Sequence, residues 1–308
     1  MDRFDVLYNE LRARCPALEL RREEPMSRHT SFRIGGPAAL MALPKSPEEA
    51  QAAVKTARAL GEEPFFLGNG SNLLVADEGV ARFFLQPAGR YGADPLNRVW
   101  EEDGKLAVGS AVSLAVAAGV AQSKGLAGLE FASGIPGSVG GAVVMNAGAY
   151  GGEMAQVVTD VTVLDRGGAF RTIPAADCGF GYRQSVFSYG EYLVLSARLA
   201  LTKDSPEAIR ARMDDLAARR REKQPLEYPS AGSMFKRPAG HFAAALIDQC
   251  GLKGFSVGGA QVSEKHAGFV VNRGGATCAD VLALVDQVKA RVRTQTGVEL
   301  EMEVKVLR

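Results

Sequence analysis

The sequence predicts an α+β fold made of three units. Strand-like and helix-like patterns alternate along its 308 residues, the middle of the chain carries several strand patterns joined by tight turns, and the last third returns to capped helices. Units of roughly 90 to 110 residues are an ordinary domain size. We therefore expect boundaries that divide the chain into residues 1–88, 89–202 and 203–308.

The first unit combines helices with short apolar strands. An apolar stripe predicts an amphipathic helix near the start of the chain, followed by a polar connector up to residue 28. A capping box at Ser46, with proline at the first helical position, predicts a helix over residues 46–60. Strands are expected over residues 64–67, 73–75 and 83–85, which would give a small βαββ-like unit.

The second unit is predicted to contain an antiparallel sheet. Residues 99–109 alternate around Asp103-Gly104, a dipeptide that is typical of β-hairpin turns. An Ala- and Val-rich helix is expected over residues 113–124. Further strands are expected over residues 157–164, 169–173 and 192–201.

The third unit is predicted mainly from its helix ends. Ser205-Pro206 begins a charged helix that runs to about residue 222, and another helix is expected over residues 242–250. The pattern over residues 277–296 predicts a long helix with one apolar stripe. Strands are expected over residues 266–272 and, from strict alternation, over 299–307.

Two glycine-rich stretches predict places where backbone approaches a ligand. Residues 129–152 contain seven glycines and no lysine or arginine, and residues 67–75 read Leu-Gly-Asn-Gly-Ser-Asn-Leu-Leu-Val. Neither is a Rossmann fingerprint, and no P-loop motif occurs in the chain. Such loops present N–H groups that can hold a diphosphate without a cation, whereas a tight buried turn is the plainer interpretation of either stretch alone.

Composition and charge disfavour several classes of function. Lys plus Arg number 36 against 35 for Asp plus Glu, so no net field favours nucleic acid or an anionic membrane. The four cysteines and three histidines show no metal-ligand spacing, so no metal site is expected, and the scattered cysteines fit a reducing compartment. Neither a signal peptide nor an apolar run of about 18 residues occurs, and we expect a cytoplasmic protein without membrane insertion.

Seven short motifs follow one another along the chain. They are Thr30-Ser-Phe with Gly35-Gly36, Gly68-Asn-Gly-Ser-Asn72, Ser133-Gly-Ile-Pro-Gly-Ser-Val-Gly-Gly141, Met145-Asn-Ala-Gly-Ala-Tyr-Gly151, Tyr182-Arg-Gln-Ser-Val-Phe187, Ala231-Gly-Ser-Met-Phe-Lys236 and Glu301-Met-Glu-Val304. Each is weak evidence alone. Together, from about residue 27 to the C-terminus, they resemble the UDP-N-acetylenolpyruvoylglucosamine reductase family, whose FAD- and NADPH-dependent members make UDP-N-acetylmuramate for peptidoglycan.

The resemblance implies a fold of the vanillyl-alcohol oxidase and p-cresol methylhydroxylase type. In that fold two subdomains hold FAD, here noncovalently, and a C-terminal α+β domain binds the substrate. Because the family does not attach FAD through histidine, His29 is expected to make only a local hydrogen bond. The family's FAD contacts correspond in this sequence to Gly68, Asn69, Gly70, Ser71, Asn72, Ser133, Gly134, Ile135, Pro136, Gly137, Ser138, Gly140, Gly141, Asn146 and Ala147.

The resemblance also implies the chemistry. In the family, a hydride from NADPH passes by way of the flavin to C3 of the enolpyruvyl group of UDP-N-acetylglucosamine enolpyruvate, and a proton reaches C2. Ser233 matches the family's proton donor, Glu303 its C-terminal catalytic glutamate, and Arg183 the partner of the substrate carboxylate. Without the family, these residues would be interpreted as a turn hydroxyl, a solvent-facing carboxylate and a surface cation.

Four further residues are candidate contacts for the UDP-sugar. They are Tyr182 and His266 and, for the diphosphate, Lys223 and Lys236, although Lys223 is equally explained as helix-end charge. The predicted strand over 192–201 follows the Tyr-Arg motif almost at once. This leaves no room for the insertion that supplies a tyrosine lid in longer members, so the chain resembles the shorter subclass.

Two other functions stay open at this point. A flavin oxidase of the same fold, acting on a sugar or lactone, would lack the Gly-Ser-x-Phe-Lys segment that carries Ser233. A degenerate FAD- or UDP-sugar-binding protein without turnover is disfavoured by the joint presence of Arg183, Ser233 and Glu303. NADPH oxidation that depends on the enolpyruvyl substrate would distinguish the reductase from both.

Overall fold

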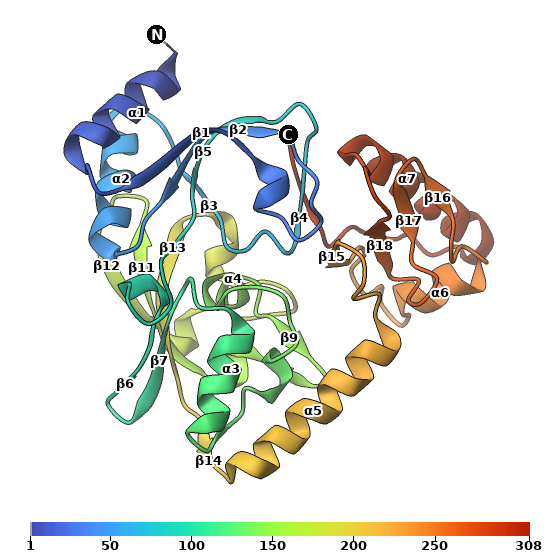
Figure 1. Cartoon of the computed structure of the whole chain (residues 1–308). Helices are drawn as coiled ribbons and strands as arrows, with labels where there is room; N and C mark the ends of the chain where they lie inside the picture. Colours follow the sequence, from blue (N-terminus) through green and yellow to red (C-terminus); the bar gives the residue numbers. More distant parts are fainter. Residues whose placement is uncertain (1) are drawn as a thin grey trace. The chain divides into compact units, whose positions relative to one another are not determined.

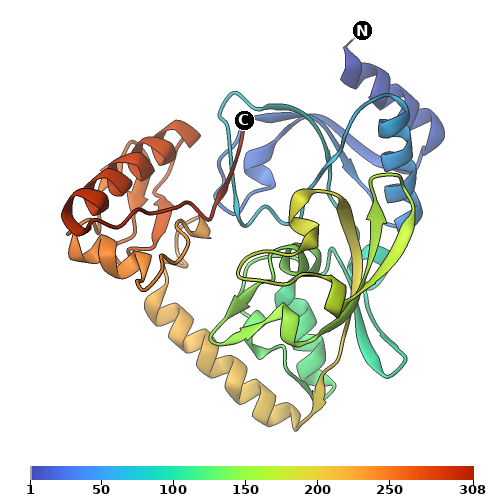
Figure 2. The same cartoon turned by 180° about the vertical axis from the view of Figure 1, so that it is seen from behind.

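The computed structural model describes residues 2–308, which form two compact units (Figures 1 and 2). The first unit consists of Met1–Arg22, Ala39–Asn69 and Arg82–Ala218, and the second of Glu23–Ala38, Gly70–Ala81 and Arg219–Arg308. The chain therefore contributes two short segments to the second unit before its C-terminal part. The division into three domains expected from the sequence stays a prediction.

A four-stranded sheet with the order β1-β2-β5-β3 begins the fold. Its strands are β1 (Glu19–Pro25), β2 (Pro37–Leu43), β3 (Phe65–Phe66) and β5 (Val80–Leu85), and helices α1 (Arg3–Arg14) and α2 (Pro47–Ala59) lie side by side (Figure 1). Residues 19–25 were expected to be a connector, which is wrong. β1 is a charged edge strand with one buried residue, so it carries no apolar alternation to reveal it.

The predicted helix over residues 46–60 is confirmed, but its capping box is only half formed. Ser46 Oγ accepts a hydrogen bond from the Glu49 amide at 3.2 Å. The Glu49 carboxylate accepts instead from the amide of Lys45, at 2.7 Å. The predicted residue Ser46 thus still satisfies one amide of the first turn, that of Glu49.

The antiparallel sheet predicted for the middle of the chain is confirmed. Its order is β12-β11-β13-β7-β6, and every neighbouring pair is antiparallel. Asp103 and Gly104 form the hairpin turn with φ values of 50° and 71°. The strands are β6 (Val99–Glu102), β7 (Lys105–Gly109), β11 (Val158–Asp165), β12 (Phe170–Pro174) and β13 (Tyr192–Leu199), with helix α3 (Leu114–Ser123) after β7.

Shorter elements complete the first unit. They are β8 (Leu126–Ala127), α4 (Val139–Val144), β9 (Gly148–Ala149), β10 (Gly152–Glu153) and β14 (Thr202–Lys203). Single 3₁₀ turns occur along the chain at Met26–Arg28, Pro95–Asn97, Glu130–Ala132, Met154–Gln156, Ala175–Asp177 and Val186–Tyr189. Two separate clusters of buried apolar side chains stabilise this unit, one around the five-stranded sheet and α3, the other around α1, α2 and β5.

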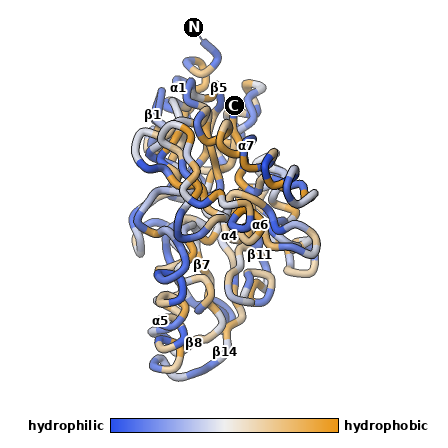
Figure 3. The backbone as a smooth tube through the Cα atoms, turned by 90° about the vertical axis from the view of Figure 1, so that its right-hand side faces the viewer, coloured by the Kyte–Doolittle hydropathy of each residue, from blue (hydrophilic) through white to orange (hydrophobic). Residues whose placement is uncertain are grey.

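Helix α5 (Pro206–Lys223) is the long charged helix predicted from Ser205-Pro206. Only Ile209 and Met213 are buried along it, and hydrophilic residues dominate its course in Figure 3. The boundary between the two units falls within this helix, after Ala218. In residues 2–308, no helix is long and apolar enough to cross a membrane.

The second unit has an antiparallel sheet with the order β15-β18-β17-β16. Helix α7 (Cys278–Thr296) buries the predicted stripe of Val281, Leu284, Val285, Val288 and Val292, and Gly297 ends it with φ 73°. The remaining elements are β4 (Leu73–Val75), β15 (Ser230–Ser233), α6 (Ala243–Gln249), β16 (Ser256–Val257), β17 (Ala260–Val262), β18 (Phe269–Asn272) and β19 (Lys305–Leu307).

Three strand predictions in this unit need correction. The strand expected over 266–272 begins only at Phe269, because the Phe269 amide closes a turn onto the His266 carbonyl. The strand expected over 299–307 is regular only at Lys305–Leu307, since the residues before it pair with a different segment. The strand expected over 73–75, β4, was placed in the first unit, but it lies outside the β1-β2-β5-β3 sheet and pairs in parallel with β19.

Candidate active site

The two predicted cofactor loops touch each other within the first unit. A Cβ atom placed on Gly68 would lie 3.2 Å from Ser138 Oγ and 3.3 Å from Gly141 Cα. A Cβ atom on Gly140 would lie 2.8 Å from that of Ser110. These glycines are therefore needed for close backbone packing, and the packing brings the start of one glycine stretch against the other.

Part of the longer glycine stretch is helical, which the sequence did not predict because glycine and valine are weak helix formers. Ser138 caps α4, and its hydroxyl accepts from the Gly141 amide at 3.4 Å. The amides of Val139 and Gly140 donate to the carbonyls of Val112 and Ser110, at 2.8 and 2.9 Å. The first turn of α4 is thus already paired with protein.

Amides without protein partners occur in both stretches. Within residues 2–308, the backbone N–H groups of Asn69, Gly70, Ser71, Gly137 and Ser138 donate no hydrogen bond to the protein. Gly70 is buried and has φ 58°, and a Cβ atom there would lie 2.0 Å from the His29 carbonyl oxygen. Amides that donate to no protein group need another acceptor, and in the first unit those of Asn69, Gly137 and Ser138 fit an anionic group such as a diphosphate.

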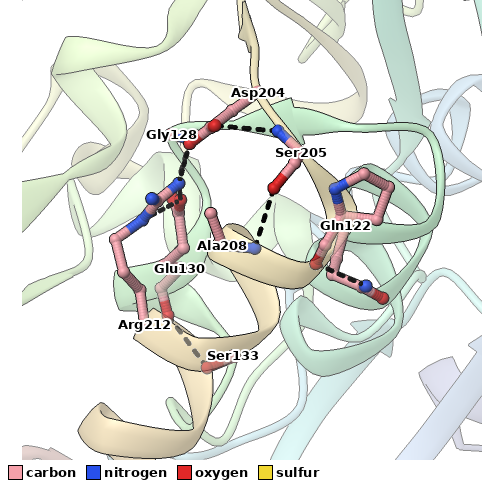
Figure 4. A network of polar contacts seen from close by, with 9 residues as sticks. Gln122, Gly128, Glu130, Ser133, Asp204, Ser205, Ala208 and Arg212 are labelled. Atoms are coloured by element: carbon pink, nitrogen blue, oxygen red, sulfur yellow. Dashed lines mark hydrogen bonds and ion pairs between the residues drawn. The ribbon is translucent and has the colours of Figure 1, made fainter.

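A polar network anchors the start of the longer stretch to α5 (Figure 4). The Glu130 carboxylate accepts from the Arg212 guanidinium at 3.0 and 2.7 Å and from the Gly128 amide at 2.7 Å, and Arg212 also donates to Asp204. Burial raises the pKa of Glu130, but hydrogen bonds from backbone amides and Arg212 outweigh it, so the pKa is lowered overall. Ser133 Oγ donates to the Glu130 carbonyl at 2.9 Å.

Arg183 lies at the end of the same stretch. Its guanidinium donates to the Gly148 carbonyl oxygen at 3.3 and 3.2 Å, and its backbone has φ 56°. The side chain of Asn146 is buried and hydrogen-bonded at both polar atoms, since Nδ2 donates to the Gly181 carbonyl and Oδ1 accepts from the Ala155 amide. Asn146 therefore connects the glycine stretch to the segment that carries Arg183.

Ser233 and Glu303 are brought together in the second unit. The Glu303 amide donates to the Met234 carbonyl at 2.9 Å, and the Lys236 amide donates to the Glu301 carbonyl at 2.8 Å. Ser233 ends β15 directly after Gly232, which has φ 77°, and its side chain is exposed. The predicted acid and the predicted glutamate thus lie on adjacent, hydrogen-bonded segments that are about 70 residues apart in sequence.

The Gly70–Asn72 part of the first loop is bonded directly to the segment of Glu303, and to strand β15 through Ser31. Asn72 Nδ2 donates to the Glu303 carbonyl at 3.2 Å, and the Asn72 carbonyl accepts from the Lys305 amide at 3.0 Å. The Ser31 amide donates to the Gly70 carbonyl at 3.3 Å, and Ser31 Oγ donates to the Ser230 carbonyl at 2.7 Å. Sequence reasoning gave Ser31 no role, although the residue belongs to the Thr30-Ser-Phe motif.

The four candidate substrate contacts differ in their surroundings. Tyr182 is 59% exposed, and Lys223 is exposed at the end of α5, where helix-end charge still explains it. Lys236 forms an ion pair with Glu301. His266 accepts from the Gly268 amide through Nδ1, and burial lowers its pKa.

His29 makes the local contact expected of it. Its Nε2 lies 2.9 Å from the Glu24 carboxylate, and both side chains are about nine-tenths buried. The expectation of a local hydrogen bond is confirmed.

Comparison with known proteins identifies the family. Residues 38–173 match the FAD binding domain family, and residues 224–307 match the family described as UDP-N-acetylenolpyruvoylglucosamine reductase, C-terminal domain. The UDP-N-acetylenolpyruvoylglucosamine reductase of Syntrophomonas wolfei is 46% identical over 301 residues, which cover 98% of this chain and 99% of that protein. The chain belongs to this reductase family.

Other members of the reductase family are similar to this chain over nearly its whole length. The reductase of Geobacillus thermodenitrificans is 43% identical and covers 100% of this chain and 99% of its own. The crystal structure of UDP-N-acetylenolpyruvylglucosamine reductase from Thermus caldophilus has a TM-score of 0.80 at 38% identity, covering 94% of this chain and 100% of that one. The predicted resemblance and the predicted α+β FAD-binding fold are confirmed.

Proposed function

We propose that this reductase-family chain is an NADPH-dependent flavoprotein that converts UDP-N-acetylglucosamine enolpyruvate to UDP-N-acetylmuramate for peptidoglycan synthesis. The observation that carries the proposal is the adjacency of Ser233 and Glu303, which places a hydroxyl and a carboxylate on neighbouring backbone segments. The match of residues 224–307 to the reductase C-terminal domain covers both residues. The lactone or sugar oxidase alternative does not account for this domain.

The cofactor is FAD, held noncovalently by the two glycine-rich stretches. Within the first unit, the amides of Asn69, Gly137 and Ser138 donate to no protein group and suit its diphosphate, since the stretches themselves contain no lysine or arginine. Bound FAD supplies the transfer of a hydride from NADPH to C3 of the enolpyruvyl group.

Residues of the chain itself stabilise the substrate carboxylate and supply the proton. A hydride arriving at C3 places a negative charge that spreads from C2 into the substrate carboxylate, and Arg183 stabilises that charge. Glu303 polarises the same group, and Ser233 delivers a proton to C2 and regains one from water. In total NADPH loses one hydride, becoming NADP⁺, and the carbon–carbon double bond gains that hydride and one proton.

The UDP-sugar is proposed to contact Tyr182, Lys223, Lys236 and His266. Lys236 already pairs with Glu301, whose side chain is 72% exposed, while that of Lys236 is 43% exposed. Exposed ion pairs are weak, so a substrate diphosphate can replace the glutamate as the partner of the lysine. Neutral His266 would act as a hydrogen-bonding group, because burial disfavours its charged form. We place this small-molecule chemistry in the cytoplasm, with no nucleic-acid partner.

The test is a direct assay of the purified protein. We expect a yellow chromophore that heat or acid releases, and NADPH oxidation that depends on UDP-N-acetylglucosamine enolpyruvate. Oxygen supplied in place of that substrate should oxidise the protein-bound flavin only slowly. NADPH consumption at the same rate with and without the enolpyruvyl compound would overturn the assignment, and rapid oxygen consumption would favour the oxidase.

A further inference from the structure

We propose that Ser31 is a positioning residue for the proton donor Ser233. The inference rests on the proposed function, which gives Ser233 its role. Ser31 touches neither the predicted acid nor the predicted glutamate, and it acts through the start of strand β15.

The argument begins with a closed ring of hydrogen bonds in the second unit. Ser31 donates from its amide to the Gly70 carbonyl and from its hydroxyl to the Ser230 carbonyl. The chain then runs from Ser230 through Ser233 to Met234, whose carbonyl accepts from the Glu303 amide. The Glu303 carbonyl accepts from the side chain of Asn72, and Asn72 leads back to Gly70. The ring thus contains the cofactor loop and both predicted catalytic residues of this unit.

The pairing of β15 with β18 does not by itself fix the position of the Ser233 side chain. Ser230 pairs with Val271 and Ser233 with Phe269, so three steps along β15 are matched by two along β18. The extra residue makes a bulge, and Gly232 within it has φ 77°. A bulge redirects the side chain that follows it, so the position of Ser233 depends on how firmly each end of the bulge is held.

Ser31 holds one end of that bulge from a rigid turn. Its hydroxyl bond to the Ser230 carbonyl is short, at 2.7 Å, and part-buried. The turn that carries Ser31 is itself fixed, because Thr30 Oγ1 donates to the Ile34 carbonyl and Asn272 Nδ2 donates to the Phe32 carbonyl. At the other end, the Met234 amide donates to the Gly268 carbonyl at 2.8 Å. Without the Ser31 hydroxyl, the first end would keep only its pairing with β18, including the hydrogen bond of 2.9 Å from the Asn272 amide to the Pro229 carbonyl, so it would be held less firmly while the second end is unchanged.

The experiment compares Ser31→Ala with Ser31→Thr, which keeps the hydroxyl, and with Ser27→Ala as the matched control. Ser27 lies in the same segment, and in the described part of the chain its hydroxyl makes no hydrogen bond to protein. In the FAD-loaded protein, bleaching of the flavin by NADPH should be unchanged in all three variants. Reoxidation by UDP-N-acetylglucosamine enolpyruvate should slow about 10- to 100-fold in Ser31→Ala, because a misplacement of about 1 Å costs this much in rate. Ser31→Thr should recover most of that loss.

A second measurement does not depend on turnover. Hydrogen exchange followed by mass spectrometry should show faster exchange in peptides covering residues 230–236 of Ser31→Ala, with peptides of α7 unchanged. The solvent deuterium isotope effect on substrate reduction should also rise, as proton delivery becomes slower.

Three outcomes would overturn the inference. They are a wild-type rate of substrate reduction in Ser31→Ala, an equal slowing of both half-reactions, and unchanged exchange in residues 230–236. If the wild-type protein itself fails to reduce the enolpyruvyl substrate, the proposed function fails instead, and the exchange measurement still decides whether Ser31 holds β15.

Discussion

Ser233 combines an exposed hydroxyl with a backbone that is hydrogen-bonded immediately after it. The amide of Met234 bonds to Gly268, and the carbonyl of Met234 bonds to Glu303. A proton donor has to reach its acceptor while it keeps a defined position, and this arrangement meets both needs. Arg183 is held differently, through its own guanidinium on the Gly148 carbonyl, so substrate binding would have to share or replace that contact.

Substitution of the proposed acid gives the sharpest prediction at this scale. Ser233→Ala should leave flavin bleaching by NADPH intact and slow substrate reduction by about 10²- to 10⁴-fold, the usual contribution of a general acid. Stopped-flow absorbance of the flavin measures the two half-reactions separately. Equal slowing of both would mean that Ser233 is not the proton donor.

At the scale of elements, helix α7 begins with a cap supplied from a distant part of the chain. The Asp77 carboxylate accepts from the amides of Cys278 and Ala279, at 2.7 and 3.1 Å, and Thr277 caps the Asp280 amide. Asp77 follows β4 closely, and β4 continues from the Gly70–Asn72 loop. The cap therefore ties the longest helix of the second unit to the segment that carries the cofactor loop.

Removal of this cap should destabilise the second unit. Asp77→Ala is expected to lower the free energy of unfolding by about 1–2 kcal/mol, as other N-cap losses do. Urea unfolding followed by circular dichroism measures the change, and Asp286→Ala, an exposed carboxylate within the same helix, is the control. A similar loss in both variants would argue against the cap.

The link between α5 and the longer glycine stretch predicts a pH dependence. The pKa of Glu130 is lowered in the folded protein. Its carboxylate therefore stabilises the fold above the unfolded pKa of about 4.3, and this stabilisation is lost as the pH falls through the folded pKa. Glu130→Gln should therefore cost about 1–2 kcal/mol at pH 7 and progressively less below about pH 4. Urea unfolding at both pH values checks this, with the exposed Glu222→Gln as control. A cost that does not change with pH would place the effect in packing rather than charge.

At the scale of the whole molecule, each of the two units contains one buried and one partly buried cysteine, so thiol reactivity can follow the opening of each unit separately. All four are free, and Cys178 in the first unit and Cys278 in the second are buried. Burial raises the pKa of each of these two thiols to about 11. Cys15 and Cys250 are only partly buried.

This distribution predicts the reactivity of the native protein. At most two of the four thiols should react quickly with a disulfide reagent, and Cys178 and Cys278 should react only when their unit opens. Mass spectrometry of labelled peptides along a urea series assigns each thiol. Fast labelling of Cys278 in the native protein would contradict the packing of α7, whose first residue it is.

The sequence by itself determined most helix limits and the hairpin. The side chains of Ser46, Ser113 and Thr277 each cap a helix by accepting a hydrogen bond from the amide three residues later. Gly297 ends α7 in the left-handed conformation that glycine favours. The residues of the candidate site came from the family resemblance, because a lone Ser233 or Glu303 carries no distinguishing pattern. Helix caps and hairpin turns are local patterns, and so they can be recognised without knowledge of the fold.

Only the tertiary structure decided which distant segments meet. β4 looked like a partner of the strands around it, yet it pairs with β19, and the residues just before β19 pair with the segment that follows Ser233. The ring through Ser31 likewise joins residues up to about 270 positions apart. The caps formed by Ser46, Ser113 and Thr277 depend on neighbours within one turn, whereas the Asp77 cap and the strand partners depend on contacts across the whole chain, which alternation in a single strand does not encode.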